Sequence, residues 1–166
     1  MTISQAIENM ITYTAADSNV IPHDVEHFLK VWGYAKTIGE LERVDEQTLF
    51  IIEMSAILHD IACPLCRRKY GNTNGKYQEI EGIELVKKFL KDSDLECKTI
   101  DRIVFLVSHH HTYTDVDSKD WQILLEADYI VNASESSYSI ENIIEAYNNL
   151  FKTEHGRIIL KNIYSI

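Results

Sequence analysis

Apolar residues recur at intervals of three and four along almost the whole of this sequence, which is the spacing that gathers them on one face of a helix. No stretch alternates apolar and polar residues, as a half-buried strand does, over more than four positions. The pattern predicts an all-α fold, a compact bundle of about six to seven helices. We expect helices at about residues 2–15, from 22 onward, 46–62, 79–90, 96–110, 119–132 and 139–151, followed by a short C-terminal tail.

The run from Glu46 to Ala62 is apolar nearly all round, so we expect it to be the central helix of the bundle. It should end before Pro64, because the residue preceding a proline is pushed away from helical geometry. The following segment, RRKYGNTNGK (67–76), is rich in Gly, Asn and Lys and is predicted to be a loop.

Length and composition bound the classes of protein that this chain can be. With 166 residues and 45% hydrophobic content we expect one domain over 1–166, with a core of motifs at about 22–132 and a C-terminal helix and tail at 139–166. No apolar run approaches the roughly 20 residues that cross a bilayer, and the first residues do not resemble a signal peptide, so a cytoplasmic location is expected. Three cysteines with no dense spacing make no disulfide framework.

The formal net charge of −10 opposes a non-specific grip on a nucleic-acid polymer or on an anionic membrane, since both need a basic surface. An anionic partner of this chain should therefore be small and held locally.

Four ionisable residues stand within or beside apolar helical stripes: His27, His59, Asp60 and Asp128. Burying such groups without partners costs several kcal/mol, so their presence needs an explanation. A satisfied core histidine and a simple salt bridge to Asp128 are the plainer alternatives for single members of the set. Together, two imidazoles and two carboxylates from three helices predict a metal site inside the bundle, suited to Mn²⁺, Fe²⁺, Co²⁺, Ni²⁺, Zn²⁺ or, less naturally, Mg²⁺.

The order His27, His59-Asp60, Asp128 resembles the H…HD…D signature of the HD domain superfamily of metal-dependent phosphohydrolases. Three segments carry the resemblance: HDVEHFLKV, AILHDIA and LLEADYIVN. It implies these four residues as ligands of one divalent metal ion, with His59 and Asp60 as the catalytic pair. The implied reaction is hydrolysis of a phosphoester by metal-activated water, and the implied partner is a small phosphorylated substrate, by analogy a nucleotide.

Further residues near these motifs are candidates for substrate binding or for a second metal ion. His23 lies one turn before His27 and could compete with it, although the family spacing favours His27. In SHHHTYTD, periodicity does not decide which histidine points inward; we expect His109 and His110, with capping of a helix C-terminus as the alternative. The basic residues after the HD pair are candidates for gripping phosphate: Arg67, Arg68, Lys69 and Lys76.

The resemblance implies a second-metal histidine before a glycine in the next helix, where this chain has Gln78 four residues before Gly82. That departure favours a nucleotidase-like phosphomonoesterase over a cyclic diesterase. Glu79 could act as a general acid or base only if it faces the metal, and an acidic residue in a first helical turn is more often a dipole partner. The alternative function is a regulatory module that keeps the metal and senses a nucleotide without turnover.

Overall fold

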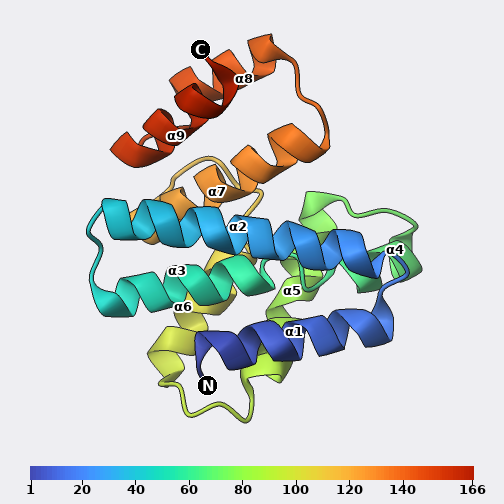
Figure 1. The fold of residues 1–166 in the computed structure, drawn as a ribbon. Helices are drawn as coiled ribbons and strands as arrows, with labels where there is room; N and C mark the ends of the chain where they lie inside the picture. The colour runs from blue at the N-terminus through green and yellow to red at the C-terminus, as the bar shows by residue number, and fades with distance from the viewer.

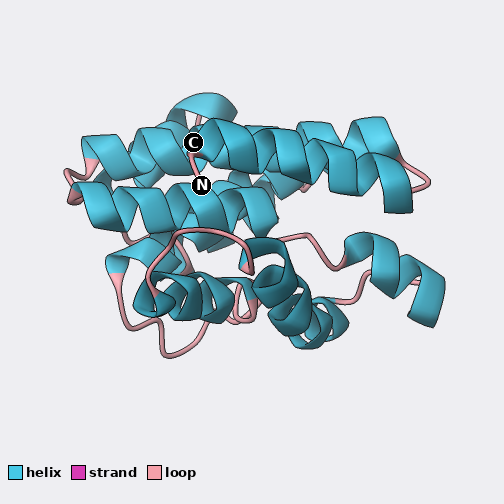
Figure 2. Ribbon diagram, turned by 90° about the horizontal axis from the view of Figure 1, so that it is seen from below, coloured by secondary structure: helices cyan, strands magenta, loops and turns pink.

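The computed structural model describes all residues, 1–166, and consists of nine helices joined by loops, with no strand (Figures 1 and 2). Figure 1 follows them from the blue N-terminus to the red C-terminus. The all-α prediction is confirmed, but the number of helices exceeds the six to seven expected. The helices are α1 (Ile3–Asp17), α2 (Ile21–Leu41), α3 (Glu46–Leu58), α4 (Cys63–Tyr70), α5 (Gly75–Leu90), α6 (Cys97–Val107), α7 (Lys119–Glu135), α8 (Ile140–Asn149) and α9 (Glu154–Tyr164).

Two helices account for the difference. Residues 67–70 of the segment expected to be a loop belong to α4. This helix forms because Pro64 lies in its first turn, where the missing N–H of a proline costs nothing. Gly71 ends α4 in the left-handed conformation (φ 71°) that glycine adopts without strain. The expected C-terminal tail contains α9, whose first turn is capped by the Thr153 side chain.

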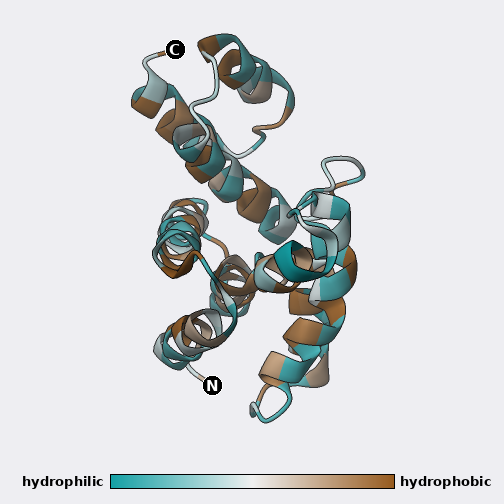
Figure 3. Cartoon of the chain, turned by 90° about the vertical axis from the view of Figure 1, so that its right-hand side faces the viewer, coloured by the Kyte–Doolittle hydropathy of each residue, from teal (hydrophilic) through white to brown (hydrophobic).

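Helix α3 lies at the centre and packs against α2, α6, α7 and α1. Its apolar residues serve two separate hydrophobic clusters: Ile52 and Ala56 join the one formed with α2, α7, α8 and α9, and Met54 and Ile57 join the one formed with α1, α5 and α6. Each such fully buried aliphatic side chain contributes about 1.5–3 kcal/mol. This double role explains why α3 is apolar all round, whereas most other helices have a hydrophobic and a polar side (Figure 3).

The segment Glu46–Tyr70 is long and apolar enough, on average, to cross a membrane, contrary to the expectation from run length. Its most apolar window is 72% buried within the protein, as in the central helix of a folded domain.

Candidate metal centre

Four side chains converge where α2, the end of α3 and α7 meet. Nε2 of His27 lies 3.1 Å from Nε2 of His59, 3.3 Å from Oδ1 of Asp128 and 3.5 Å from Oδ2 of Asp60. Nε2 of His59 lies 3.5 Å from Oδ1 of Asp128 and 3.7 Å from Oδ2 of Asp60. Both histidines and Asp128 are buried. The structure thus gathers the four predicted ligands around Nε2 of His27.

The chain reaches this arrangement by ending α3 at Leu58. His59 and Asp60 then lie in a turn, held by hydrogen bonds from Ile61 N–H to the Leu58 carbonyl and from Cys63 N–H to the Asp60 carbonyl. In a continuous helix, consecutive side chains would point about 100° apart. In this turn both side chains approach Nε2 of His27 on α2.

Hydrogen bonds on the far side of each imidazole fix where its proton lies. Nδ1 of His59 donates to the Ala56 carbonyl at 2.8 Å, and Nδ1 of His27 donates to Oε2 of Glu135 at 2.8 Å. Since a carbonyl and an ionised carboxylate only accept, each neutral ring presents its Nε2 lone pair to the centre. Two lone pairs 3.1 Å apart repel unless a proton or a metal ion lies between them. Two imidazole nitrogens with two carboxylates therefore fit a divalent ion.

The pKa shifts of His27 and Asp60 also indicate a site that favours positive charge. Burial lowers the pKa of His27, but the hydrogen bond to Asp128 and the charges of Asp60 and Asp128 outweigh it and raise the pKa to about 10. Burial raises the pKa of Asp60, yet the neighbouring His59, His110 and His27 hold it well below its usual range. The carboxylates thus create a buried site that attracts positive charge.

A second group of ligand atoms adjoins the first through Asp60. Nε2 of His110 lies 3.5 Å from Oδ1 of Asp60, and the ring is fixed by donation from Nδ1 to the Val107 carbonyl at 2.6 Å. Ligand atoms of Asp60, His110 and His111 all lie within 4.8 Å of one another. Nε2 of His110 and Nε2 of His111 are buried without a hydrogen-bond partner. Such atoms can accept a second cation or face a substrate oxygen.

A polar cavity of about 260 Å³ opens onto these groups, with a single hydrophobic residue among those that line it. His27, Asp60 and Asp128 lie on its wall with His111. Its size and polarity suit a small, charged ligand such as a phosphate group.

Comparison with known proteins identifies the arrangement. The model of the HD domain family matches residues 24–133, which include all four converging side chains. The chain belongs to the HD domain superfamily. This is a superfamily of metal-dependent hydrolases, and HD domains bind divalent metal ions.

A solved structure from an uncultured Thermotogales bacterium, described as a predicted HD superfamily hydrolase, superimposes with a TM-score of 0.69. The alignment covers 97% of this chain and 84% of that one at 23% identity, and so it supports the fold. No curated protein matches the sequence.

Several residues predicted for this HD domain lie at the cavity. His23 and Gln78 line it, and Arg67 lines it with its guanidinium bound to both carboxylate oxygens of Asp24 at 2.8 and 2.5 Å. Glu79 accepts hydrogen bonds from the His111 N–H and the Thr112 hydroxyl, so it holds the turn that carries His111.

The expectation that His109 faces the site is wrong. Its ring stacks on Phe105 with centroids 4.2 Å apart, and Nδ1 donates to the Phe105 carbonyl at 2.8 Å. Helix α6 ends at Val107, so the histidines lie in a turn and helical periodicity does not describe their directions. His110 and His111 face the centre instead.

Three of the four predicted basic residues also lie away from the cavity wall. Arg68 pairs with Asp17, and Lys69 pairs with Glu81 at 2.6 Å. Lys76 is exposed in the first turn of α5, where its N–H donates to the Asn74 side chain. Because α4 is a helix, consecutive basic residues point in different directions, and only Arg67 turns to the cavity.

Sequence reasoning missed the residues that orient the ligands of this HD domain. Glu135 binds His27, and Nδ2 of Asn132 donates to Oδ1 of Asp128 at 2.8 Å. Positions 128, 132 and 135 are spaced by four and three, so they share one face of α7. That spacing was the signal available in the sequence.

Proposed function

We propose that this HD domain hydrolyses a phosphomonoester of a small molecule, a nucleotide by analogy with the family. The observation that carries the proposal is the convergence of imidazole lone pairs and two carboxylates on one buried point beside a polar cavity. His27, His59, Asp60 and Asp128 would hold one divalent ion. Bound there, such an ion lowers the pKa of a water molecule toward neutrality and offsets charge that develops on a phosphoryl group.

Asp60 and His59 are the residues to which we assign catalysis. Asp60 points Oδ2 toward His27 and His59 and Oδ1 toward His110, so its ionised carboxylate can orient a water molecule by accepting a hydrogen bond at Oδ1. The hydrogen bond from His59 Nδ1 to the Ala56 carbonyl keeps Nε2 unprotonated and correctly directed.

The phosphate group would meet His110, His111 and Arg67. The two histidines offer buried nitrogens without partners. Arg67 adds a positive charge at the cavity wall, held in place by Asp24, in a protein whose formal net charge is −10. A small, locally held anion fits this arrangement better than a polymer does.

Two details favour a monoester over a cyclic diester. Gln78 stands where the two-metal proteins of this family would place a histidine, and its amide is already engaged: Nε2 donates to the Thr73 carbonyl at 2.9 Å and Oε1 accepts from the Cys63 thiol at 3.2 Å. A second ion would therefore rely on Asp60, His110 and His111 alone.

The test is phosphate release from a panel of mono-, di- and triphosphate nucleotides and sugar phosphates, with and without Mn²⁺ or Co²⁺. The native chain is compared with Asp60→Ala and with Asp92→Ala, an exposed aspartate outside the site that serves as the control. We expect metal-dependent release from the native chain and the control, and none from a folded Asp60→Ala protein.

Tight nucleotide binding without turnover by the metal-loaded native chain would overturn the proposal in favour of a sensing module.

A further inference from the structure

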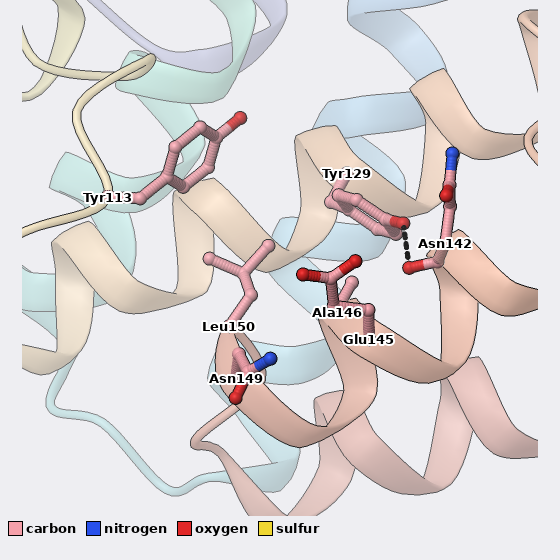
Figure 4. A pocket seen from close by; sticks show the side chains of 7 residues that line it. All are labelled: Tyr113, Tyr129, Asn142, Glu145, Ala146, Asn149 and Leu150. Atoms are coloured by element: carbon pink, nitrogen blue, oxygen red, sulfur yellow. Dashed lines mark hydrogen bonds between the residues drawn. The ribbon is translucent and has the colours of Figure 1, made fainter.

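A second cavity, of about 440 Å³, lies where α7, α8 and the loop after α6 meet (Figure 4). It is formed by Tyr113 from the loop after α6, by Tyr129 from α7, and by residues of α8 and its C-cap. It shares no lining residue with the metal cavity. Its volume falls in the range of about 300–1,000 Å³ that is typical of small-molecule sites.

The wall combines aromatic rings with polar groups. Tyr113 and Tyr129 contribute the rings, and Ala146 and Leu150 contribute aliphatic surface. The Glu145 carboxylate lies between Leu150 and Tyr129 in the view of Figure 4. Flat rings with a directed acceptor are the features that bind a planar heterocycle, by stacking on its faces and hydrogen bonding to its edge.

The polar groups of this wall have no partners within the chain. Neither the Tyr113 hydroxyl nor the side chains of Asn142, Glu145 and Asn149 form a hydrogen bond or ion pair, and the one side-chain hydrogen bond among the lining residues runs from the Tyr129 hydroxyl to the Asn142 carbonyl at 3.1 Å. Tyr113 is 49% exposed and stacks on no other ring. The fold does not require these groups for its own stability, so they remain available to a ligand.

The second cavity adjoins the metal centre. Tyr129 directly follows Asp128 in α7, and Tyr113 lies two residues after His111. A ligand with a phosphate and a planar group joined by a sugar could therefore contact both cavities.

We propose that the second cavity binds the base of a nucleotide whose phosphate occupies the metal cavity, and that Glu145 selects guanine. A carboxylate accepts hydrogen bonds but donates none, so it favours a base edge with adjacent N–H donors. Guanine offers a ring N–H next to an exocyclic amino group, whereas uracil and thymine have a ring N–H flanked by carbonyl oxygens. This proposal rests on the proposed phosphohydrolase function for the position of the phosphate.

The first experiment measures binding alone. Guanosine and uridine, which carry no phosphate, are titrated into the metal-free full chain by isothermal titration calorimetry. The variants are Glu145→Gln and the control Glu141→Gln, which makes the same charge change at an exposed position of the same helix outside the cavity. We expect guanosine to bind more tightly than uridine, with a loss of about ten-fold or more in Glu145→Gln only.

The second experiment measures the ratio of kcat/KM for guanosine monophosphate to that for p-nitrophenyl phosphate, which has no base. We expect this ratio to fall by about ten-fold or more in Glu145→Gln and to stay unchanged in Glu141→Gln.

Absence of guanosine binding at millimolar concentration, or equal binding by Glu145→Gln and the native chain, would overturn the base site even if phosphate is released. Guanosine binding that depends on Glu145 in a chain without phosphatase activity would support the base site and reject the proposed function.

Discussion

The contact between Gly156 and Glu126 makes Gly156→Ala a sharp test of the packing around α9. The Glu126 carboxylate is fully buried and accepts hydrogen bonds from the Lys152 N–H at 2.6 Å, the Thr153 N–H at 2.9 Å, the Thr153 hydroxyl and Nε2 of Gln122 at 2.7 Å. It thereby joins α7 to the loop between α8 and α9. A Cβ on Gly156 would overlap Oε2 of Glu126 and lie 2.6 Å from the Thr153 hydroxyl oxygen and 3.0 Å from Cδ of Glu126.

The alanine methyl group must therefore displace the carboxylate or shift α9. A buried charged group that loses its hydrogen bonds costs about 1–3 kcal/mol for each, and partial relaxation recovers some of this. We expect the free energy of unfolding to fall by about 3–5 kcal/mol. At about 2–4 °C per kcal/mol for a chain of this size, Tm should fall by about 10 °C.

Urea unfolding followed by circular dichroism measures the change, with Gly33→Ala as the matched control. Gly33 lies inside α2 and a Cβ there meets no atom within 4 Å, so alanine should raise stability by about 0.5–1 kcal/mol. In a Glu126→Ala background, Gly156→Ala should lower the free energy of unfolding much less, because the carboxylate that the new methyl group would overlap is absent. A Gly156→Ala protein within about 1 kcal/mol of the native chain would refute the reasoning.

Three further measurements test the electrostatics. Because the pKa of His27 is raised to about 10, this residue is protonated at pH 8. Binding of a divalent metal ion should therefore release about one proton, which calorimetry in buffers of different ionisation enthalpy measures. For the same reason, the affinity for the metal ion should rise with pH. Glu135→Gln should weaken metal binding about 10–100-fold, measured by competition with a chelator, and unchanged affinity would mean that the His27 hydrogen bond is unimportant. Burial raises the pKa of Glu42, but hydrogen bonds from His155 and Lys119 outweigh it and lower the pKa from 4.5 to about 2. Because the folded-state pKa is depressed, ionised Glu42 stabilises the fold above pH 4.5, and this stabilisation is lost as the pH falls toward 2. Glu42→Gln should therefore lower the free energy of unfolding, measured by denaturant titration, by about 1–2 kcal/mol at pH 7 and leave it unchanged at pH 2.

The fold class followed from sequence because the helical period is clear in the amphipathic helices, and α3, which faces two hydrophobic clusters, was recognisable by its apolar composition. The same reasoning missed α9. Its eleven residues are clearly amphipathic and bury Gly156 and Leu160, so the signal was present in a segment that was taken for a tail. It also missed α4, because a proline can mark either the end of one helix or the first turn of the next. Pro64 follows α3 and also lies in the first turn of α4.

At the metal centre, the convergence of His27, the HD pair and Asp128 followed from the sequence, whereas the directions of the histidines after α6 did not. His27 and Asp128 lie on α2 and α7, and both converge with the HD pair. His109 and His111 lie beyond the end of α6, where the direction of each side chain depends on turn geometry and on Glu79, which is distant in sequence. Contacts between distant segments of this kind cannot be derived from the spacing within one helix.

Asp128 and Tyr129 are consecutive residues of α7, one facing the metal cavity and the other the second cavity. A rigid helix therefore fixes the distance between the two cavities, and any ligand that contacts both must have a matching length. Lengthening the ligand by one phosphate would move its terminal phosphorus out of register with the metal centre, whichever base it carries. The number of phosphates in the ligand would thus be selected by the fixed spacing along α7. The residues of α8 that complete the second cavity could be substituted without altering that spacing.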